Sequence, residues 1–146
     1  MTILDANILL YATDAAAPQY RAVSDWLKKS VAGGEVVGLP WITLWAFLRI
    51  STNPRLWANP KSGSEACGLI GLWLAQPGVV VPEPGPRHMA IIERLVGEYS
   101  ITSPLVTDAA LAALAIEHGA TLASTDQDFR RFPEVRWINP LAPDAR

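Results

Sequence analysis

The sequence predicts an α/β domain with three layers (α/β/α), in which helices cover both faces of a central, mostly parallel β-sheet. Short runs of aliphatic and β-branched residues alternate with longer segments whose apolar residues recur every three or four positions. Glycine, proline or asparagine follows most of these segments, as is usual at helix ends and turns. Strands that alternate with helices favour a parallel sheet, because parallel strands need long crossover connections.

The expected strands are short and cover residues 2–4, 36–39, 79–81, 121–124 and 135–138. The expected helices cover residues 19–31, 41–51, 65–74, 87–99 and 108–118, with a helical turn at 127–131. Residues 8–11 form a further apolar segment directly after the first strand. Gly33 and Gly119 follow the first and last of the long helices, where glycine is the usual stop. No repeat or linker divides residues 1–146, so we expect a single domain.

The composition limits the kinds of partner the protein has. Half of the residues are hydrophobic and only 18% are charged, against about 25% charged in average domains. Such a surface favours a homodimer or another protein interface, and Trp41, Trp45 and Trp57 are the first candidates for it. The net charge of −2 excludes a strongly basic nucleic-acid footprint. It still allows nucleic acid that is held through a metal ion and a few arginines.

The sequence also predicts a cytoplasmic protein with no membrane segment. The single cysteine, Cys67, excludes an internal disulfide and a multi-cysteine zinc site, and it fits a reducing compartment. The first residues lack the basic and apolar regions of a secretory signal. The longest apolar stretches, residues 39–48 and 67–75, are too short to span a bilayer.

Four aspartates occupy positions where an apolar, β-like run is expected to give way to a helix: Asp5, Asp108, Asp126 and Asp128. Ligands of open α/β sheets bind just beyond the carboxyl ends of the strands, so we expect these carboxylates to converge. Asp108 and Asp126, taken singly, are equally well read as helix caps. Asp5 lies between two apolar runs and needs a partner, because burying an unpaired carboxylate is expensive. Clustered like charges are costly unless a cation shares them, so the joint pattern predicts a divalent metal.

Carboxylates without nearby histidine or cysteine select a hard cation, so the expected cofactor is Mg²⁺ or Mn²⁺. Such an ion lowers the pKa of a bound water and offsets charge on a leaving oxygen, which suits hydrolysis of a phosphodiester. The sequence has no phosphate-binding glycine loop, no dinucleotide fingerprint and no serine-nucleophile elbow. A phosphoryl-transfer domain with Asp5 as nucleophile would need a late lysine, but the lysines are Lys28, Lys29 and Lys61.

Several segments resemble the PIN domain, and specifically the VapC-type toxin ribonucleases of bacterial toxin–antitoxin pairs. The resemblance runs from about residue 3 to residue 141. The matching segments are Leu4-Asp5-Ala6-Asn7, Phe47-Leu48-Arg49, Thr52-Asn53-Pro54-Arg55, Thr107 to Ala115 with His118-Gly119, Ser124 to Phe129, and Trp137-Ile138-Asn139-Pro140. The resemblance implies a metal-dependent endoribonuclease that acts on structured RNA such as tRNA. It also implies a homodimer and a cognate antitoxin that inserts a C-terminal segment into the acidic pocket.

Carried over residue by residue, the resemblance gives Asp5 and Asp108 as the principal metal ligands and Asp126 as the later acidic position. These three are the expected catalytic residues. Asp128 is expected as a neighbour of Asp126 or a substitute for it, and Asn7 matches a polar residue that binds near the metal. Arg49, Arg130 and Arg131 are separate candidates for contacts with phosphate or with a partner.

One position departs from the family pattern. The family usually carries a glutamate on the helix at residues 41–51, near residues 44–46, where this sequence has no acid. Two hypotheses follow. In the first, the remaining aspartates, or an acid such as Glu93 brought near in space, support catalysis. In the second, the protein is a degenerate PIN domain that binds protein or RNA without cutting.

Overall fold

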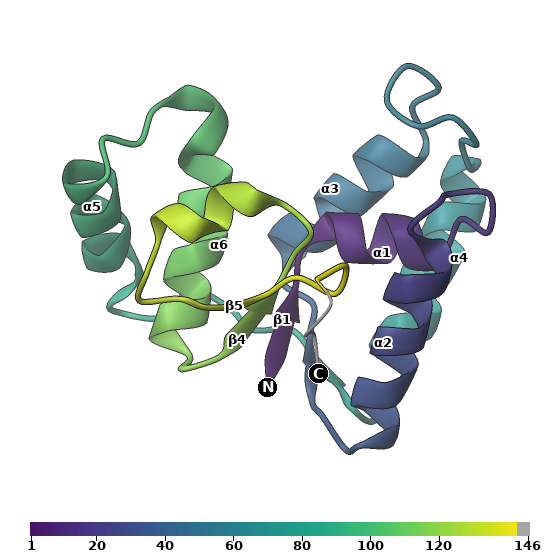
Figure 1. The fold of residues 1–146 in the computed structure, drawn as a ribbon, viewed down its shortest axis with the longest axis horizontal. Helices are drawn as coiled ribbons and strands as arrows, with labels where there is room; N and C mark the ends of the chain where they lie inside the picture. The colour runs from purple at the N-terminus through teal and green to yellow at the C-terminus, as the bar shows by residue number, and fades with distance from the viewer. Residues whose placement is uncertain (143–146) are drawn as a thin grey trace.

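The computed structural model describes residues 1–142 and contains a five-stranded parallel sheet (Figure 1). The strand order is β3-β2-β1-β4-β5, and each adjacent pair runs in parallel. The strands are β1 (Thr2–Leu4), β2 (Val37–Gly38), β3 (Val79–Val80), β4 (Thr121–Ala123) and β5 (Arg136–Ile138). Strand β1, near the start of the chain, pairs with β4, which lies more than 110 residues later, with Thr2 opposite Thr121 and Leu4 opposite Ala123. The predicted parallel sheet is confirmed.

Six α-helices flank the sheet and confirm the predicted three layers. They are α1 (Ala6–Ala12), α2 (Tyr20–Ala32), α3 (Trp41–Ser51), α4 (Gly63–Leu74), α5 (His88–Glu98) and α6 (Val106–Glu117). Two 3₁₀ turns, η1 (Ser103–Leu105) and η2 (Gln127–Arg131), complete the described elements. Helices α5 and α6 lie on one side of β1 and β4, and α1, α2 and α4 lie on the other (Figure 1).

Each face of the sheet carries its own hydrophobic core. Ile3 packs with α5, α6 and η2, whereas Leu4 packs with the helices α1 to α4. Leu122 and Ala123 of β4 divide in the same way between the two cores. Successive side chains of a strand point to opposite faces, so a strand covered on both sides is apolar throughout. A carboxylate therefore has no room within such a strand, and the position directly after the strand is the first that leaves the two hydrophobic cores.

Two local predictions need correction. Residues 8–11, which the sequence analysis gave only as an apolar segment, belong to helix α1. Asp5 is the one residue between this helix and β1. Asp108 does not follow a β-like run: the turn η1 leads directly into α6, and Asp108 lies in the first turn of that helix. Pro104, at the start of η1, fixes a helical φ and has no N–H to place in a strand ladder. Only the ends of β1 and β4 therefore supply strand-end carboxylates.

The return from α6 to the central strand depends on Gly119, as the sequence predicted. Its φ of 59° lies in the left-handed region that glycine enters without penalty. The N–H of Gly119 donates to Ile116 O, and the N–H of Ala120 donates to Ala115 O at 2.8 Å. These bonds close the helix and start β4 at residue 121. Among residues 1–142, no helix is both long enough and apolar enough to cross a membrane.

Candidate metal centre

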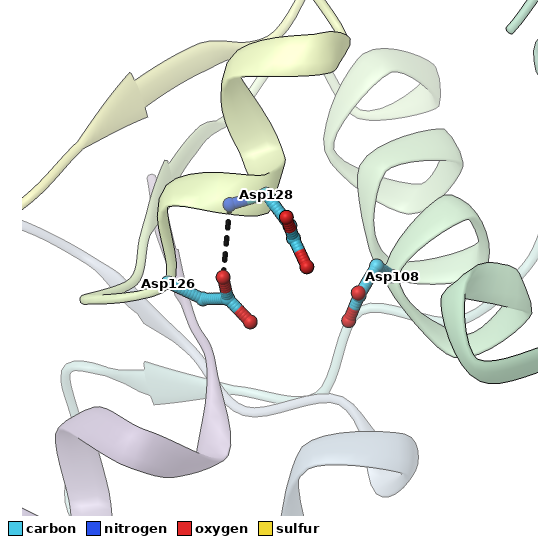
Figure 2. A group of neighbouring side chains, drawn as sticks. All are labelled: Asp108, Asp126 and Asp128. Atoms are coloured by element: carbon cyan, nitrogen blue, oxygen red, sulfur yellow. Dashed lines mark hydrogen bonds between the residues drawn. The ribbon is translucent and has the colours of Figure 1, made fainter.

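Three carboxylates from two parts of the chain meet at the carboxyl edge of the sheet (Figure 2). One oxygen each of Asp108, Asp126 and Asp128 lies within 4.8 Å of the others. Asp108 comes from the first turn of α6, and the other two come from the segment that follows β4. The Asp108 side chain is half-buried, whereas Asp126 and Asp128 are exposed. In Figure 2 the three side chains point toward a common space between α6 and η2.

The local sequence around η2 sets the positions of two of these acids. Asp126 is the N-cap of η2, and its Oδ1 accepts a hydrogen bond from the backbone N–H of Asp128 at 2.8 Å. Aspartate is favoured at this position because its side chain satisfies an N–H that the helix itself leaves free. The capping interpretation of Asp126 is therefore correct, and one of its carboxylate oxygens still belongs to the triad.

Asp5 lies beside the triad and is held by a dense set of hydrogen bonds. Its Oδ1 accepts from the N–H of Ala6 at 2.7 Å, as an N-cap of α1. Its Oδ2 accepts from the hydroxyl of Ser124 at 2.6 Å and from Nδ2 of Asn7 at 2.8 Å. Three donors on one carboxylate fix its orientation. They also satisfy the largely buried charge for which the sequence required a partner.

Ser124 connects this carboxylate to the triad, and the sequence reasoning did not single it out. Its fully buried hydroxyl donates to Asp5 and accepts from Asn7 Nδ2 at 2.9 Å and from the N–H of Asp126 at 3.0 Å. The hydroxyl thus uses its one donor and both acceptor positions. A buried hydroxyl directly after an apolar strand was the available signal, because such a group must find partners.

Asn7 has a mainly architectural position. Its Nδ2 donates to Asp5 and Ser124, and its Oδ1 accepts from the N–H of Thr125 at 3.1 Å. All of these partners lie in the segments that follow β1 and β4. The side chain therefore ties those two segments together beneath the acidic cluster.

The pKa values of Asp108 and Asp5 are raised. The pKa of Asp108 rises from 3.8 to about 6, first because burial disfavours its charge and then because Asp126, Asp5 and Asp128 are negative. Burial also raises the pKa of Asp5, with a further contribution from Asp126, although its hydrogen bonds act in the opposite direction. Four acids in mutual repulsion form a site whose charge a cation would offset.

A cavity of about 280 Å³ opens next to these acids. Asp5 and Asp108 line it, together with Thr43, Trp45, Ala46 and Arg49 of α3 and three other residues. The hydroxyl of Thr43 donates to the carbonyl oxygen of Leu4 at 2.7 Å and so fixes α3 against the end of β1. Thr43, a polar residue within the apolar first half of α3, was the sequence signal for this contact. Within the described chain, no carboxylate of α3 enters the cavity, and Ala46, in the region of residues 44–46 where the family's glutamate was expected, lines it.

Glu35, Glu65 and Glu93 are not part of this cluster. Glu35 accepts from the Thr2 hydroxyl and pairs with the N-terminal amine at 3.1 Å. Glu65 is in the first turn of α4, in a capping box with Ser62. Glu93 is exposed on α5, and among residues 1–142 it belongs to no group of potential metal ligands. The third acid of the cluster is instead Asp128.

The three arginines have different surroundings. Arg49 lines the cavity, and within residues 1–142 it has no salt-bridge partner. Arg131 donates from Nε to the carbonyl of Asp128, and its terminal nitrogen lies 3.4 Å from the Asp128 carboxylate. Its charge is close enough to lower the pKa of Asp108. Arg130 is exposed and lies over the ring of Trp137, 5.7 Å from its centre. The structure thus brings two of the three near the acids.

The geometry fits a hard divalent cation. Oxygens on opposite sides of such an ion are separated by twice the metal–oxygen distance, which is about 4.0–5.2 Å for distances of roughly 2.0–2.6 Å. The triad oxygens already lie within 4.8 Å of one another. An ion at their centre would therefore need only small side-chain movements. The donor set contains oxygen alone, which is the preference of Mg²⁺ and Mn²⁺.

The fold and site define a class of protein: parallel α/β domains with an acidic, metal-binding cluster at the carboxyl edge of the sheet. Residues 2–135 match the family model described as the PIN domain. Ribonuclease VapC37 of Mycobacterium tuberculosis is 39% identical over 142 residues, which cover 97% of this chain and 99% of the relative. Ribonuclease VapC33 of the same species is 40% identical over 141 residues, with 97% and 99% coverage. The chain belongs to the PIN-domain family and, within it, to the VapC ribonuclease toxins.

Solved structures show the same fold. The structure of VapBC2 from Rickettsia felis, bound to a promoter DNA fragment, contains a chain that matches with a TM-score of 0.71 at 18% identity. That match covers 94% of this chain and 97% of the other. A chain of FitAcB from Neisseria gonorrhoeae matches with a TM-score of 0.66 at 21% identity, covering 96% and 98%.

Proposed function

We propose that this VapC-family ribonuclease is a divalent-metal-dependent endonuclease that uses Mg²⁺ or Mn²⁺ and cleaves structured RNA such as tRNA. The observation that carries the proposal is the triad of Asp108, Asp126 and Asp128, whose oxygens lie within 4.8 Å of one another. Relatives named ribonucleases, 39–40% identical over nearly the whole chain, support the same chemistry.

In this proposal the triad holds the ion, and Asp5 contributes a further carboxylate in the cavity that it lines together with Asp108. A bound divalent cation would lower the pKa of a water molecule and offset charge on the cleaved phosphate. Asp5 Oδ1 accepts only the Ala6 N–H among the described donors, so it retains a lone pair for a hydrogen bond from the attacking water. Ser124 and Asn7 keep that carboxylate in place.

Arg49 and Arg131 are proposed to bind the phosphates of the substrate. Arg49 lines the cavity with Asp5 and Asp108, so its guanidinium is within reach of a phosphate that enters there. Arg131 pairs with Asp128, and this charge becomes available to phosphate if a cation takes over the carboxylate. Arg130, which lies on Trp137, is proposed to contact RNA further from the site.

The proposal includes a protein partner. The similar structures include VapBC2 bound to a DNA fragment from its promoter and FitAB bound to a DNA fragment. We expect a cognate antitoxin that inhibits this chain by covering the acidic cavity, and a homodimer of the toxin. An RNA substrate also agrees with the cytoplasmic location expected from the sequence.

The direct test is cleavage of total RNA by the purified protein with Mg²⁺, with Mn²⁺ and with EDTA. Asp108→Asn keeps the size of the side chain and removes one ligand. Loss of a residue that only hydrogen-bonds to a metal ligand typically costs roughly 10- to 100-fold in activity. Because Asp108 is itself a proposed ligand, we expect Asp108→Asn to reduce the cleavage rate by more than that. Asp25→Asn, an exposed aspartate of α2, is the matched control and should cleave like the wild type.

Sequencing of the fragments then identifies the RNA class, with cuts in tRNA as the expected result. Equal cleavage by wild type and Asp108→Asn would remove the mechanism. No cleavage of any RNA with either metal would favour the degenerate domain raised by the missing α3 acid. The intact triad argues against that alternative, because Asp128 supplies a third carboxylate without help from α3.

A further inference from the structure

Helix α3 carries an exposed stripe that the acidic site does not explain. Trp41, Trp45 and Arg49 are spaced by four residues, so they lie along one face of the helix. The exposed fractions of the two tryptophans are 41% and 65%. Their indole rings lie next to each other, with 6.2 Å between the ring centres and 30° between the ring planes, so they form one continuous aromatic surface. Large exposed apolar surface of this kind marks a binding site more often than chance.

Trp57 does not share this surface, although the sequence grouped it with the other two. Its ring packs against Tyr11 at 5.6 Å between centres, and its Nε1 donates to Asp14 Oδ2 at 2.9 Å. Trp57 is therefore a structural residue of the loop after α3. The exposed aromatic surface therefore consists of Trp41 and Trp45 alone, on one face of α3.

This stripe forms the rim of the acidic cavity. Trp45 and Arg49 line the same 280 Å³ cavity as Asp5 and Asp108. Trp41 and Trp45 also line a neighbouring, mostly apolar cavity of about 440 Å³, which is lined by Pro82 and Pro84 as well. Trp45 thus stands between a charged cavity and an apolar one. A ligand that extends from the acids along α3 meets the indole of Trp45 and then that of Trp41.

We propose that Trp45 and Trp41 stack against unpaired RNA bases next to the cleaved phosphodiester, while Arg49 holds the adjoining phosphate. Proteins that bind single-stranded nucleic acid combine positive charge along the backbone with aromatic faces for successive bases. RNA is recognised chiefly in loops, where bases are free to leave the stack. The assignment rests on the proposed ribonuclease function and names its substrate as a single-stranded or looped segment.

A second copy of this chain is the competing occupant of an exposed aromatic face. A copy seated on Trp45 would cover the mouth of the cavity that contains Asp5 and Asp108. A ribonuclease needs that mouth open to RNA. Arg49 adds a positive charge in the same row, which suits a phosphodiester chain better than an apolar protein contact. The position of the stripe therefore favours RNA.

The test measures binding separately from cleavage. The probe is a fluorescein-labelled oligoadenylate, read by fluorescence anisotropy in EDTA so that no hydrolysis occurs. A ribose-phosphate oligomer of equal length that lacks bases reports the backbone contribution alone. Loss of one stacked base weakens nucleic-acid binding by about 1–3 kcal/mol, which is roughly 5- to 150-fold in Kd.

We expect Trp45→Ala and Trp41→Ala each to weaken binding of oligoadenylate by about tenfold or more. Trp45→Phe, which keeps an aromatic face, should retain most of the affinity. Leu72→Ala, which removes an equally exposed side chain (64%) from α4, is the control and should bind like the wild type. The base-free oligomer should bind weakly and equally to the wild type and to the three tryptophan variants.

Wild-type affinity of Trp45→Ala for oligoadenylate would overturn the proposal, and so would an equal loss for the base-free oligomer. Sedimentation of each variant covers the competing occupant: a weaker dimer with unchanged RNA affinity per chain would assign the stripe to a contact between copies. These failures differ from failure of the ribonuclease function. In that case the wild type cleaves no RNA, yet binding still depends on the tryptophans.

Discussion

The hydroxyl of Ser124 donates to Asp5 Oδ2 at 2.6 Å and thereby joins the carboxyl ends of the two central strands. The hydroxyl oxygen of Ser124 also accepts a hydrogen bond from the N–H of Asp126, the first acid of the metal triad to follow β4. One small side chain thus sets the distance between the carboxylate after β1 and the carboxylates after β4. The acidic site depends on this contact because the charges on either side of it repel each other.

Ser124→Ala should therefore disturb both stability and metal binding. The change leaves Asp5 without its shortest hydrogen bond, and hydrogen bonds to charged groups contribute about 1.5–3 kcal/mol. Loss of a group that orients metal ligands costs roughly 10- to 100-fold in metal affinity. Urea unfolding gives the first quantity, and titration with Mn²⁺ gives the second. Ser64→Ala, at an exposed position of α4, should change neither. Unchanged Mn²⁺ affinity in Ser124→Ala would show that the triad is positioned independently of Asp5.

Asp108→Asn should stabilise the metal-free protein, because it removes one charge from a group of four acids. Asp108 is half-buried, so solvent screening limits the expected gain to about 1 kcal/mol. The wild type should gain about 2.7 kcal/mol from Mn²⁺ at 100 times its Kd, and the variant should gain little. Thermal unfolding with EDTA and with Mn²⁺ measures both effects. If Asp108→Asn is less stable than the wild type without metal, Asp108 has only a structural role, as an acid that stabilises the first turn of α6.

The raised pKa of Asp108 predicts the pH dependence of stability. Its pKa is about 6 in the folded protein and 3.8 ordinarily. Between these values the folded state holds a proton that the unfolded chain has lost, so stability falls as pH rises from about 4 to about 6. Glu117 has the opposite effect on stability. Hydrogen bonds from the N–H groups of Gly85 and Arg87 lower its pKa below the ordinary 4.5, so the stability that Glu117 contributes is lost as the pH falls below about 4.5.

The difference between wild type and Asp108→Asn isolates this single group. In EDTA, the advantage of Asp108→Asn should be small near pH 4 and largest at pH 7. Mn²⁺ should reduce the advantage at neutral pH, because the ion takes over the role of the proton. A stability difference that does not change with pH would contradict the raised pKa.

Ala46→Glu tests the consequence of the missing acid on α3. Ala46 lines the cavity with Asp5 and Asp108, so a glutamate there would add a carboxylate to the same space. We expect lower stability without metal and an Mn²⁺ affinity higher by about tenfold, since affinity rises with the charge of the ligand set. Calorimetric titration gives the affinity and the number of ions. Ala22→Glu on the exposed face of α2 is the control for added charge. Equal affinities in both variants would place residue 46 outside the metal's reach.

Much of the fold followed from local patterns. The strands at residues 2–4 and 121–123 and the helix at 41–51 were predicted within one residue, because each combines a clear apolar pattern with a turn residue at its end. Asp5 was correctly expected directly after a buried strand, and Asp126 was correctly expected shortly after one, three residues beyond the end of β4. The error at Asp108 has a physical cause: Leu105 and Val106 look like a strand in isolation, but Pro104 starts a helical turn before them.

The site could be predicted only in part. Residue type alone indicates a hard cation, and the family resemblance indicates which aspartates matter. Whether Asp5 or Asp128 stands closer to the other two acids depends on the path of the chain after β4. The roles of Ser124 and Thr43 depend on which backbone and side-chain groups lie opposite them, and those groups are far away in sequence.

The amino-acid sequence by itself determined the layered parallel fold, the identity of the acidic residues and the family, because apolar periodicity and short motifs are local properties. The tertiary structure alone decided that β1 and β4 are neighbours, that Asp128 rather than Asp5 forms a group of three with Asp108 and Asp126, and that Trp45 and Arg49 border the same cavity. These relations arise from the packing of elements far apart in the chain, and packing is settled by the whole core at once.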